Sequence, residues 1–145
     1  MGENVKAYDV MDYERLRAFL KRVTTLDEID ERVLKCCSFI ERNEQIIAMV
    51  SYEMFDDIGM VRYFIYDQTV TAELIINMFF SLYYEAKEGG VKQLVAVAST
   101  QDACQLFEML GFSLSTNTKL RDGLNIDNDD VSILSIDLVS AVICE

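Results

Sequence analysis

The amino-acid sequence predicts a single α/β (α+β) domain with a mixed central sheet of six to seven strands and about four helices. Its 145 residues fit one domain with room for a hydrophobic core. Hydrophobic residues make up 51% of the chain and charged residues 26%, as in soluble globular proteins. Strand-like and helix-like patterns alternate in the order β-α-α-β-β-β-α-β-α-β-β.

The residue pattern of the N-terminal part predicts one strand and two helices. Residues 4–9 alternate weakly between polar and apolar, as a strand does, and apolar residues then recur every three or four positions from Tyr13 to Val23. This first helix is expected to begin near one of two aspartates, Asp9 or Asp12. Thr25 and Glu28 form a capping box, which predicts a second short helix with an apolar face of Leu26, Ile29 and Val33.

The middle of the chain predicts a three-strand meander followed by a long helix. The β-rich runs 38–40, 46–55 and 58–66 are separated by short polar breaks. A helical period begins at Thr71 and ends at Gly89 and Gly90, and its broad apolar face predicts a largely buried helix.

The C-terminal part predicts a strand over 93–98, a helix over 101–110 closed by Gly111, and strands over 112–119 and 131–139. The long helix is long enough to connect two parallel strands in a right-handed β-α-β unit.

The charge balance limits the classes of partner. There are 13 basic and 25 acidic residues, a net charge of −12. Such a chain repels nucleic-acid phosphates and anionic lipids, so neither nucleic acid nor a membrane is an expected partner. The longest apolar stretch, 74–86, is too short to span a bilayer.

Histidine is absent, which excludes histidine-based catalysis and imidazole metal ligands. The four cysteines show no C-x-x-C pair and no signal-peptide pattern precedes them, so we expect reduced thiols and a cytoplasmic location. The acidic run 127–130 lacks the glycine and glutamate of a calcium loop, so no metal site is expected.

Two segments resemble the GNAT superfamily of N-acetyltransferases. They are 90–94, which leads into a strand, and 103–112, which reads A-C-Q-L-F-E-M-L-G-F. Together with the element order, they imply a single GNAT-like domain over residues 1–145, with helices on both faces of the sheet. The resemblance also implies acetyl-CoA as cofactor and a small amine or a peptide amine as acceptor.

The family commonly has N-x-x-A-x-x-L-Y-x-K-x-G-F at this segment. Four residues match it in register: Ala103, Leu106, Gly111 and Phe112. Thr100 stands at the asparagine position, and Phe107 stands where the family has the tyrosine that protonates the departing thiolate. A phenyl ring cannot donate that proton.

The resemblance also assigns the cofactor-binding segments. The family's Q/R-x-x-G-x-G/A loop, whose glycines let the backbone approach the pyrophosphate, falls on six residues without a glycine: Val70, Thr71, Ala72, Glu73, Leu74 and Ile75. The Glu73 carboxylate would repel phosphates there. The preceding strand would offer its backbone to the pantetheine arm at Phe64, Ile65 and Tyr66, and Thr100 completes the expected site.

Two hypotheses remain open. The first is an N-acetyltransferase in which the protein positions the amine and the thioester, with Glu53, Asp56 or Asp67 as the candidate base. The second is a catalytically inactive GNAT-fold module for binding or dimerisation, since the loop, Phe107 and Thr100 all depart from the family pattern. A homodimer is expected because the run 131–143 is more apolar than one buried strand face requires.

Overall fold

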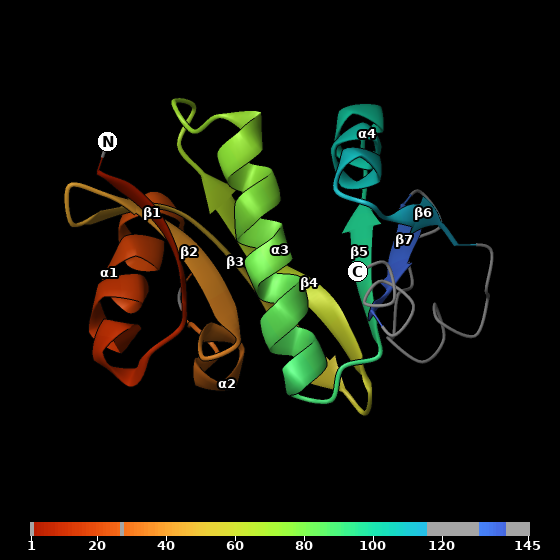
Figure 1. The fold of residues 1–145 in the computed structure, drawn as a ribbon, viewed down its shortest axis with the longest axis horizontal. Coiled ribbons are helices and arrows are strands. Elements are labelled where there is room, and N and C mark those ends of the chain that lie inside the picture. Colours follow the sequence, from red (N-terminus) through yellow and green to blue (C-terminus); the bar gives the residue numbers. More distant parts are fainter. Residues whose placement is uncertain (1, 27, 116–130, 139–145) are drawn as a thin grey trace.

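The computed structural model describes residues 2–26, 28–115 and 131–138. These residues form a seven-stranded sheet in the order β1-β2-β3-β4-β5-β7-β6 (Figure 1). Neighbouring strands are antiparallel except β4 and β5, which are parallel and are joined through α3. The predicted element order and the β-α-β unit are therefore confirmed.

The strands are β1 (Glu3–Ala7), β2 (Cys37–Arg42), β3 (Gln45–Phe55), β4 (Ile58–Tyr66), β5 (Gln93–Ala98), β6 (Ser113–Leu114) and β7 (Ser132–Asp137). The helices are η1 (Val10–Asp12), a single 3-10 turn, α1 (Tyr13–Val23), α2 (Glu31–Leu34), α3 (Ala72–Glu88) and α4 (Gln101–Met109). The predicted strand over 112–119 is described as far as residue 115, and the acidic run 127–130 lies outside the described residues.

The predicted start of the second helix is wrong. The helix α2 begins at Glu31, where the Asp30 carboxylate accepts a hydrogen bond from the Arg32 backbone N–H at 2.9 Å. Thr25 and Glu28 lie outside any helix. The reason is that Thr24 ends α1: its hydroxyl donates to the Leu20 carbonyl at 2.6 Å, and its own backbone is extended.

The helices cover both faces of the sheet. The helices α1 and α2 pack on one face, where Leu16, Leu20 and Leu34 meet Phe39 and Met49 of the sheet. The helices α3 and α4 pack on the other face, in a larger core built around Met78, Phe79, Leu82, Phe107 and Leu110. No helix in the described residues is long and apolar enough to cross a membrane.

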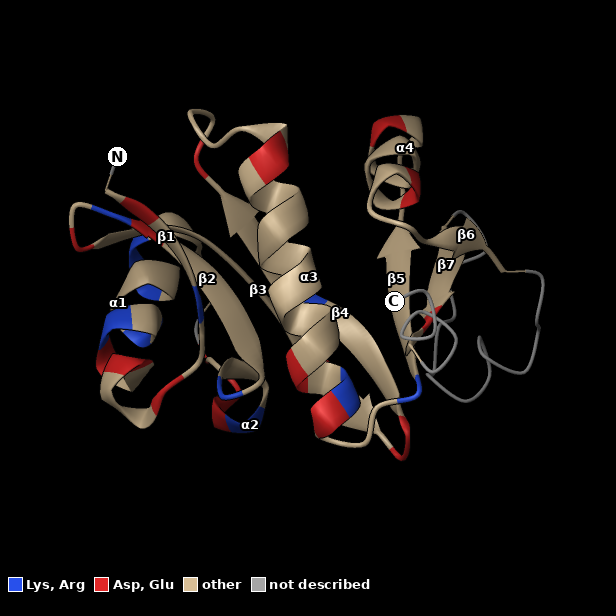
Figure 2. Ribbon diagram, viewed as in Figure 1, with Lys and Arg blue, Asp and Glu red and all other residues tan. Residues whose placement is uncertain are grey.

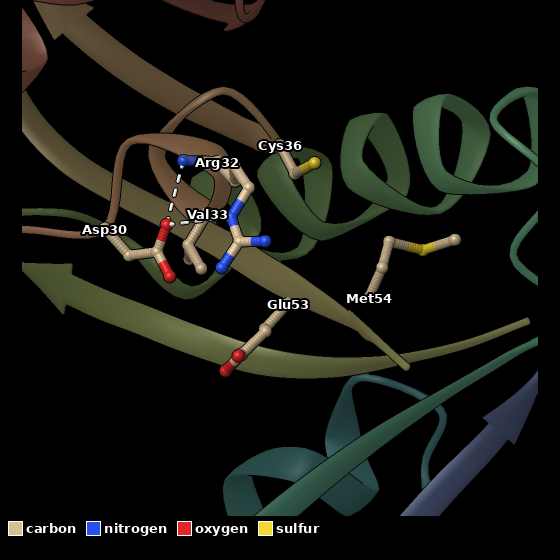
Figure 3. A pocket seen from close by; sticks show the side chains of 6 residues that line it. All are labelled: Asp30, Arg32, Val33, Cys36, Glu53 and Met54. Carbon is tan, nitrogen blue, oxygen red and sulfur yellow. Dashed lines mark hydrogen bonds and ion pairs between the residues drawn. The ribbon is translucent and has the colours of Figure 1, made fainter. Parts of the chain in front are cut away.

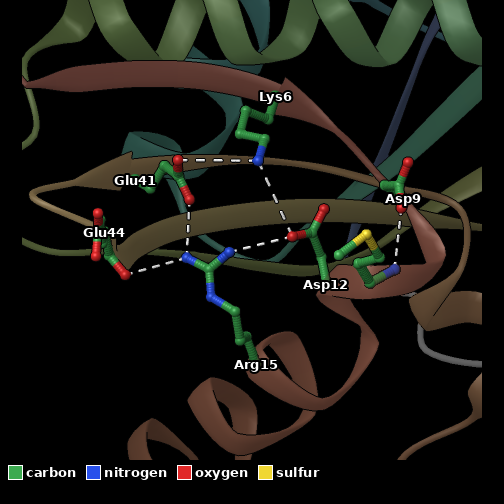
Figure 4. Close-up of polar contacts among 7 residues, drawn as sticks. Lys6, Asp9, Asp12, Arg15, Glu41 and Glu44 are labelled. Carbon is green, nitrogen blue, oxygen red and sulfur yellow. Dashed lines mark hydrogen bonds and ion pairs between the residues drawn. The ribbon is translucent and has the colours of Figure 1, made fainter.

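A polar network fixes the N-terminal segment to the sheet (Figure 4). The Arg15 guanidinium bonds to the Asp12 carboxylate at 3.1 Å, to Glu41 at 2.8 Å and to the Glu44 carbonyl at 3.1 Å. Lys6 of β1 lies 3.9 Å from Glu41. The network thus joins β1, η1, α1 and β2, and Asp12 is buried within it.

The strand β7 lies inside the sheet, between β5 and β6. Ile133 is buried on one face with Val95, and Leu134 is buried on the other in the α3–α4 core. A single chain therefore buries an apolar residue on each face of this strand. The rest of the apolar run, including Val142 and Ile143, lies outside the described residues.

Candidate functional site

The parallel strands β4 and β5 separate shortly after they meet. They pair only from Ile58–Gln93 to Met60–Val95, whereas β4 stays paired with β3 as far as Tyr66–Ala48. Beyond Met60, β4 runs behind α3 while β5 runs toward α4 (Figure 1). Along 61–66, therefore, no strand of the described part of the chain pairs with β4 on the side that faces β5.

A β-bulge lies where the strands separate. Met49 pairs with Ile65 and Ser51 pairs with Arg62, so β4 carries one more residue than β3 over this interval. Tyr63 adopts a φ of 50°, which is unusual for a residue other than glycine. The extra residue places Arg62 and Tyr63 on the α2 face together, since Arg62 pairs with Glu53 there and Tyr63 packs against the α1–α2 core.

An aromatic cluster occupies the opposite face at the same level. The Phe64 ring centroid lies 4.9 Å from that of Phe79 in α3 and 5.9 Å from that of Phe107 in α4. Phe107 also lies 5.3 Å from Phe112, and its side chain is 7% exposed. The structure thus brings two predicted site residues, Phe64 and Phe107, into contact across the gap between β4 and α4.

The predicted phosphate loop has its own hydrogen bonds. The Thr71 hydroxyl caps α3 by accepting the Leu74 N–H at 3.3 Å, and the Val70 N–H donates to the Asp67 carbonyl at 3.0 Å. Val70 and Ile75 are buried in the α3–α4 core. Thr71, Ala72 and Glu73 are exposed, so of the six predicted residues these three offer most of their surface to a ligand.

Acidic residues stand at both helix starts that flank the gap. Glu73 lies in the first turn of α3 and Asp102 in the first turn of α4. Figure 2 shows acidic segments in red on both helices. Thr100, the last predicted site residue, caps α4: its hydroxyl accepts the Ala103 N–H at 3.1 Å. Both helix N-termini therefore carry a side-chain cap and a negative charge.

A cavity of about 270 Å³ lies on the α2 face, between α2 and β3 (Figure 3). Its walls are formed by Asp30, Arg32, Val33, Cys36, Glu53 and Met54. The Glu53 carboxylate forms an ion pair with Arg62 next to the bulge. The backbone N–H of Asp30 donates to the Tyr63 hydroxyl at 3.0 Å. Two residues of the cavity wall are therefore attached to the bulge itself.

The three candidate bases lie in different places. Only Glu53 lines this cavity. Asp56 is in the turn between β3 and β4. Asp67 lies beyond β4, beside a second cavity of about 340 Å³ that Tyr66 also lines. The Thr69 backbone N–H donates to the Asp67 carboxylate and lowers its pKa.

Sequence reasoning missed Arg62 and Asp30 as parts of a candidate site. A signal existed, because Arg62 interrupts an otherwise apolar strand and a hairpin register could have placed it opposite the Glu53 region. Sequence reasoning places Tyr63 and Tyr83 near the site but interprets tyrosines at such spacing as packing residues. The structure agrees for Tyr83, which packs between α3 and α4 and is not placed as an acid. Its hydroxyl donates to the Leu110 carbonyl at 2.6 Å, and burial raises its pKa.

Comparisons with known proteins bear on the fold. No family model and no curated protein matches the chain. Among solved structures, it is similar to an N-acetyltransferase from Staphylococcus aureus Mu50, with a TM-score of 0.67 and 15% identity over 94% of this chain and 98% of that one. It is also similar to an acetyltransferase of the GNAT family from Streptococcus pneumoniae, with a TM-score of 0.66 and 14% identity over 93% and 98%.

A third similar structure is N-acetylglutamate synthase from Neisseria gonorrhoeae complexed with coenzyme A and L-arginine, with a TM-score of 0.69 and 15% identity. The match covers 93% of this chain and 33% of that one, so the chain spans about a third of the synthase. Together these similarities establish that the protein has the fold of the GNAT acetyltransferases, as the sequence predicted.

Proposed function

We propose that the protein binds acetyl-CoA along the open edge of β4 and transfers its acetyl group to an amine. The observation that carries this proposal is the separation of β4 from β5 at a bulge, in a fold shared with acetyltransferases. Structures of the same fold contain coenzyme A, including the gonococcal synthase. An extended ligand can pair with an exposed strand edge through main-chain hydrogen bonds, which depend little on side-chain identity.

In this proposal the pantetheine arm lies along Phe64, Ile65 and Tyr66, and the thioester reaches the bulge. The diphosphate lies near the exposed residues Thr71, Ala72 and Glu73. Because Glu73 is negative and no glycine allows close approach, we expect this end of the cofactor to contribute little to affinity.

The acceptor amine enters from the α2 face, because the aromatic cluster occupies the α3–α4 face. Its nitrogen lone pair forms a bond to the carbonyl carbon of the thioester, the carbon–sulfur bond breaks, and the thiolate departs. Backbone N–H groups of β4 stabilise the developing oxyanion. Glu53, the candidate base that lines the cavity, accepts the proton from the amine, and solvent protonates the thiolate, since Phe107 cannot.

Three measurements test the proposal: calorimetric titration, thermal melting and thiol release. Isothermal titration with acetyl-CoA is expected to show one site, and a concentration of about a hundred times Kd would raise Tm by about 5 to 11 °C. Thiol release is then followed with acetyl-CoA and a panel of small amines and peptide amines. Absence of binding at millimolar acetyl-CoA would refute the function.

A second candidate function is a catalytically inactive module for binding or dimerisation. Two observations favour it: the capped, glycine-free start of α3 and the Phe64–Phe107 contact, which fills space between β4 and α4. The same titration separates the two candidates, because the inactive module takes up no acetyl-CoA. Light scattering tests whether it forms a homodimer.

A further inference from the structure

We propose that Tyr63 is a positioning residue. It holds the cavity between α2 and β3, where the acceptor amine binds, in place beside the thioester site. The role rests on the proposed acetyl transfer. It is separate from the binding of acetyl-CoA, because the Tyr63 side chain lies on the α2 face, whereas the pantetheine arm is placed along the edge of β4.

The backbone at Tyr63 is held in an uncommon conformation. A φ of 50° strains a residue that has a Cβ atom, and such strain persists only where surrounding contacts maintain it. Two contacts do so here. The Asp30 N–H donates to the Tyr63 hydroxyl at 3.0 Å, and the Arg62 guanidinium lies 5.9 Å from the centre of the Tyr63 ring.

Both contacts continue into the wall of the cavity. Asp30 is the N-cap of α2, so the tyrosine hydroxyl holds the segment that begins this helix. Arg62 forms the ion pair with Glu53, and the Ser51 hydroxyl donates to the Arg62 carbonyl at 3.0 Å. The bulge, the start of α2 and the Glu53 carboxylate are therefore joined in one connected set of contacts.

The bulge makes this arrangement possible. Without the extra residue, side chains on β4 would alternate, and Arg62 and Tyr63 would point to opposite faces. With it, both lie on the α2 face and contact the cavity wall, Arg62 through Glu53 and Tyr63 through Asp30. Phe64 lies on the α3–α4 face. The position of Asp30 relative to Glu53 consequently depends on the Tyr63 hydroxyl, and so does the binding of the acceptor between them.

The test is the variant Tyr63→Phe, which keeps the ring and removes the hydroxyl. Using the amine with the highest turnover in the panel above, we expect KM for the amine to rise about fivefold to tenfold, the effect of one lost hydrogen bond. The kcat value and the Kd for acetyl-CoA stay within about twofold of wild type, since neither the thioester nor its strand edge is altered. The matched control is Tyr84→Phe, a tyrosine exposed on α3, which changes none of these values.

Amide hydrogen exchange provides an independent readout. The Asp30 amide, which loses its acceptor, is expected to exchange faster in Tyr63→Phe and to be unchanged in Tyr84→Phe. Faster exchange with an unchanged KM would overturn the positioning role, because the hydrogen bond would then hold nothing that the acceptor needs. A weaker Kd for acetyl-CoA with an unchanged amine KM would overturn it as well, by placing the effect on the donor side. If wild type binds no acetyl-CoA and turns over no amine, the proposed function fails first, and the role assigned to Tyr63 falls with it.

Discussion

The substitution Phe107→Tyr restores the hydroxyl that the family pattern has at this position. Phe107 is 7% exposed and lies among Phe64, Phe79 and Phe112, with ring centroids 5.3 to 6.3 Å away. The new hydroxyl must therefore either reach the gap beside β4, where the thioester sulfur is placed by our proposal, or remain within an apolar cluster.

The two placements of the hydroxyl predict different effects, one on the free energy of unfolding and the other on kcat. A buried hydroxyl without a partner lowers the free energy of unfolding by about 1 to 3 kcal/mol. In a domain of this size the corresponding fall in Tm is about 2 to 12 °C. A hydroxyl that protonates the departing thiolate raises kcat by about a hundredfold. Under the proposed function we expect the increase in kcat, accompanied by some loss of stability from crowding within the cluster.

The assay combines thiol-release kinetics with thermal melting of the same preparations. Phe112→Tyr is the matched control, because Phe112 is 3% exposed and belongs to the same cluster. We expect it to lower Tm without raising kcat. An unchanged kcat in Phe107→Tyr, together with a lower Tm, would refute the placement of the thioester sulfur beside this ring and would favour the inactive module.

Three further outcomes are expected. Replacing Glu73 with glutamine should tighten acetyl-CoA binding about fivefold at low salt, because one exposed like-charge contact costs about 1 kcal/mol. Screening should remove this gain at about 0.5 M salt, and titration at both salt concentrations measures it. Burial raises the pKa of Tyr83 above the unfolded value of 10.0, so its contribution to stability is fully present below that pH and falls above it. Tyr83→Phe should lower the free energy of unfolding by about 1 kcal/mol at pH 7, because the hydrogen bond to Leu110 is lost. It should also flatten the alkaline fall in Tm, which melting from about pH 8 to about pH 11 measures. If the apolar run 131–143 forms an interface, light scattering at about 100 µM should give the mass of a dimer, and a clean monomer there would contradict the homodimer hypothesis.

Local patterns in the sequence determined most of the secondary structure. The bounds of β5 and the start of α3 next to Thr71 match the predictions, because strand alternation and helical periodicity depend on residues close together in the chain. The capping box at Thr25 and Glu28 failed for a related reason: Thr24, one residue earlier, uses its hydroxyl to end α1, and Asp30 offers a competing cap for α2. Both caps are compatible with the local sequence, and the packing of α2 against the sheet selects the one at Asp30.

The sequence by itself also determined the GNAT-like element order and the absence of glycine at the start of α3. Only the tertiary structure decided which side chains meet at the separation of β4 from β5. One inserted residue at Tyr63 changes the face on which every later side chain of β4 lies, and the strand pattern alone does not reveal it. The cavity combines Asp30, before α2, with Glu53, in β3, and the aromatic cluster combines Phe64 with Phe107. Such sites depend on contacts between residues far apart in the chain, and these form only when the sheet and helices pack together.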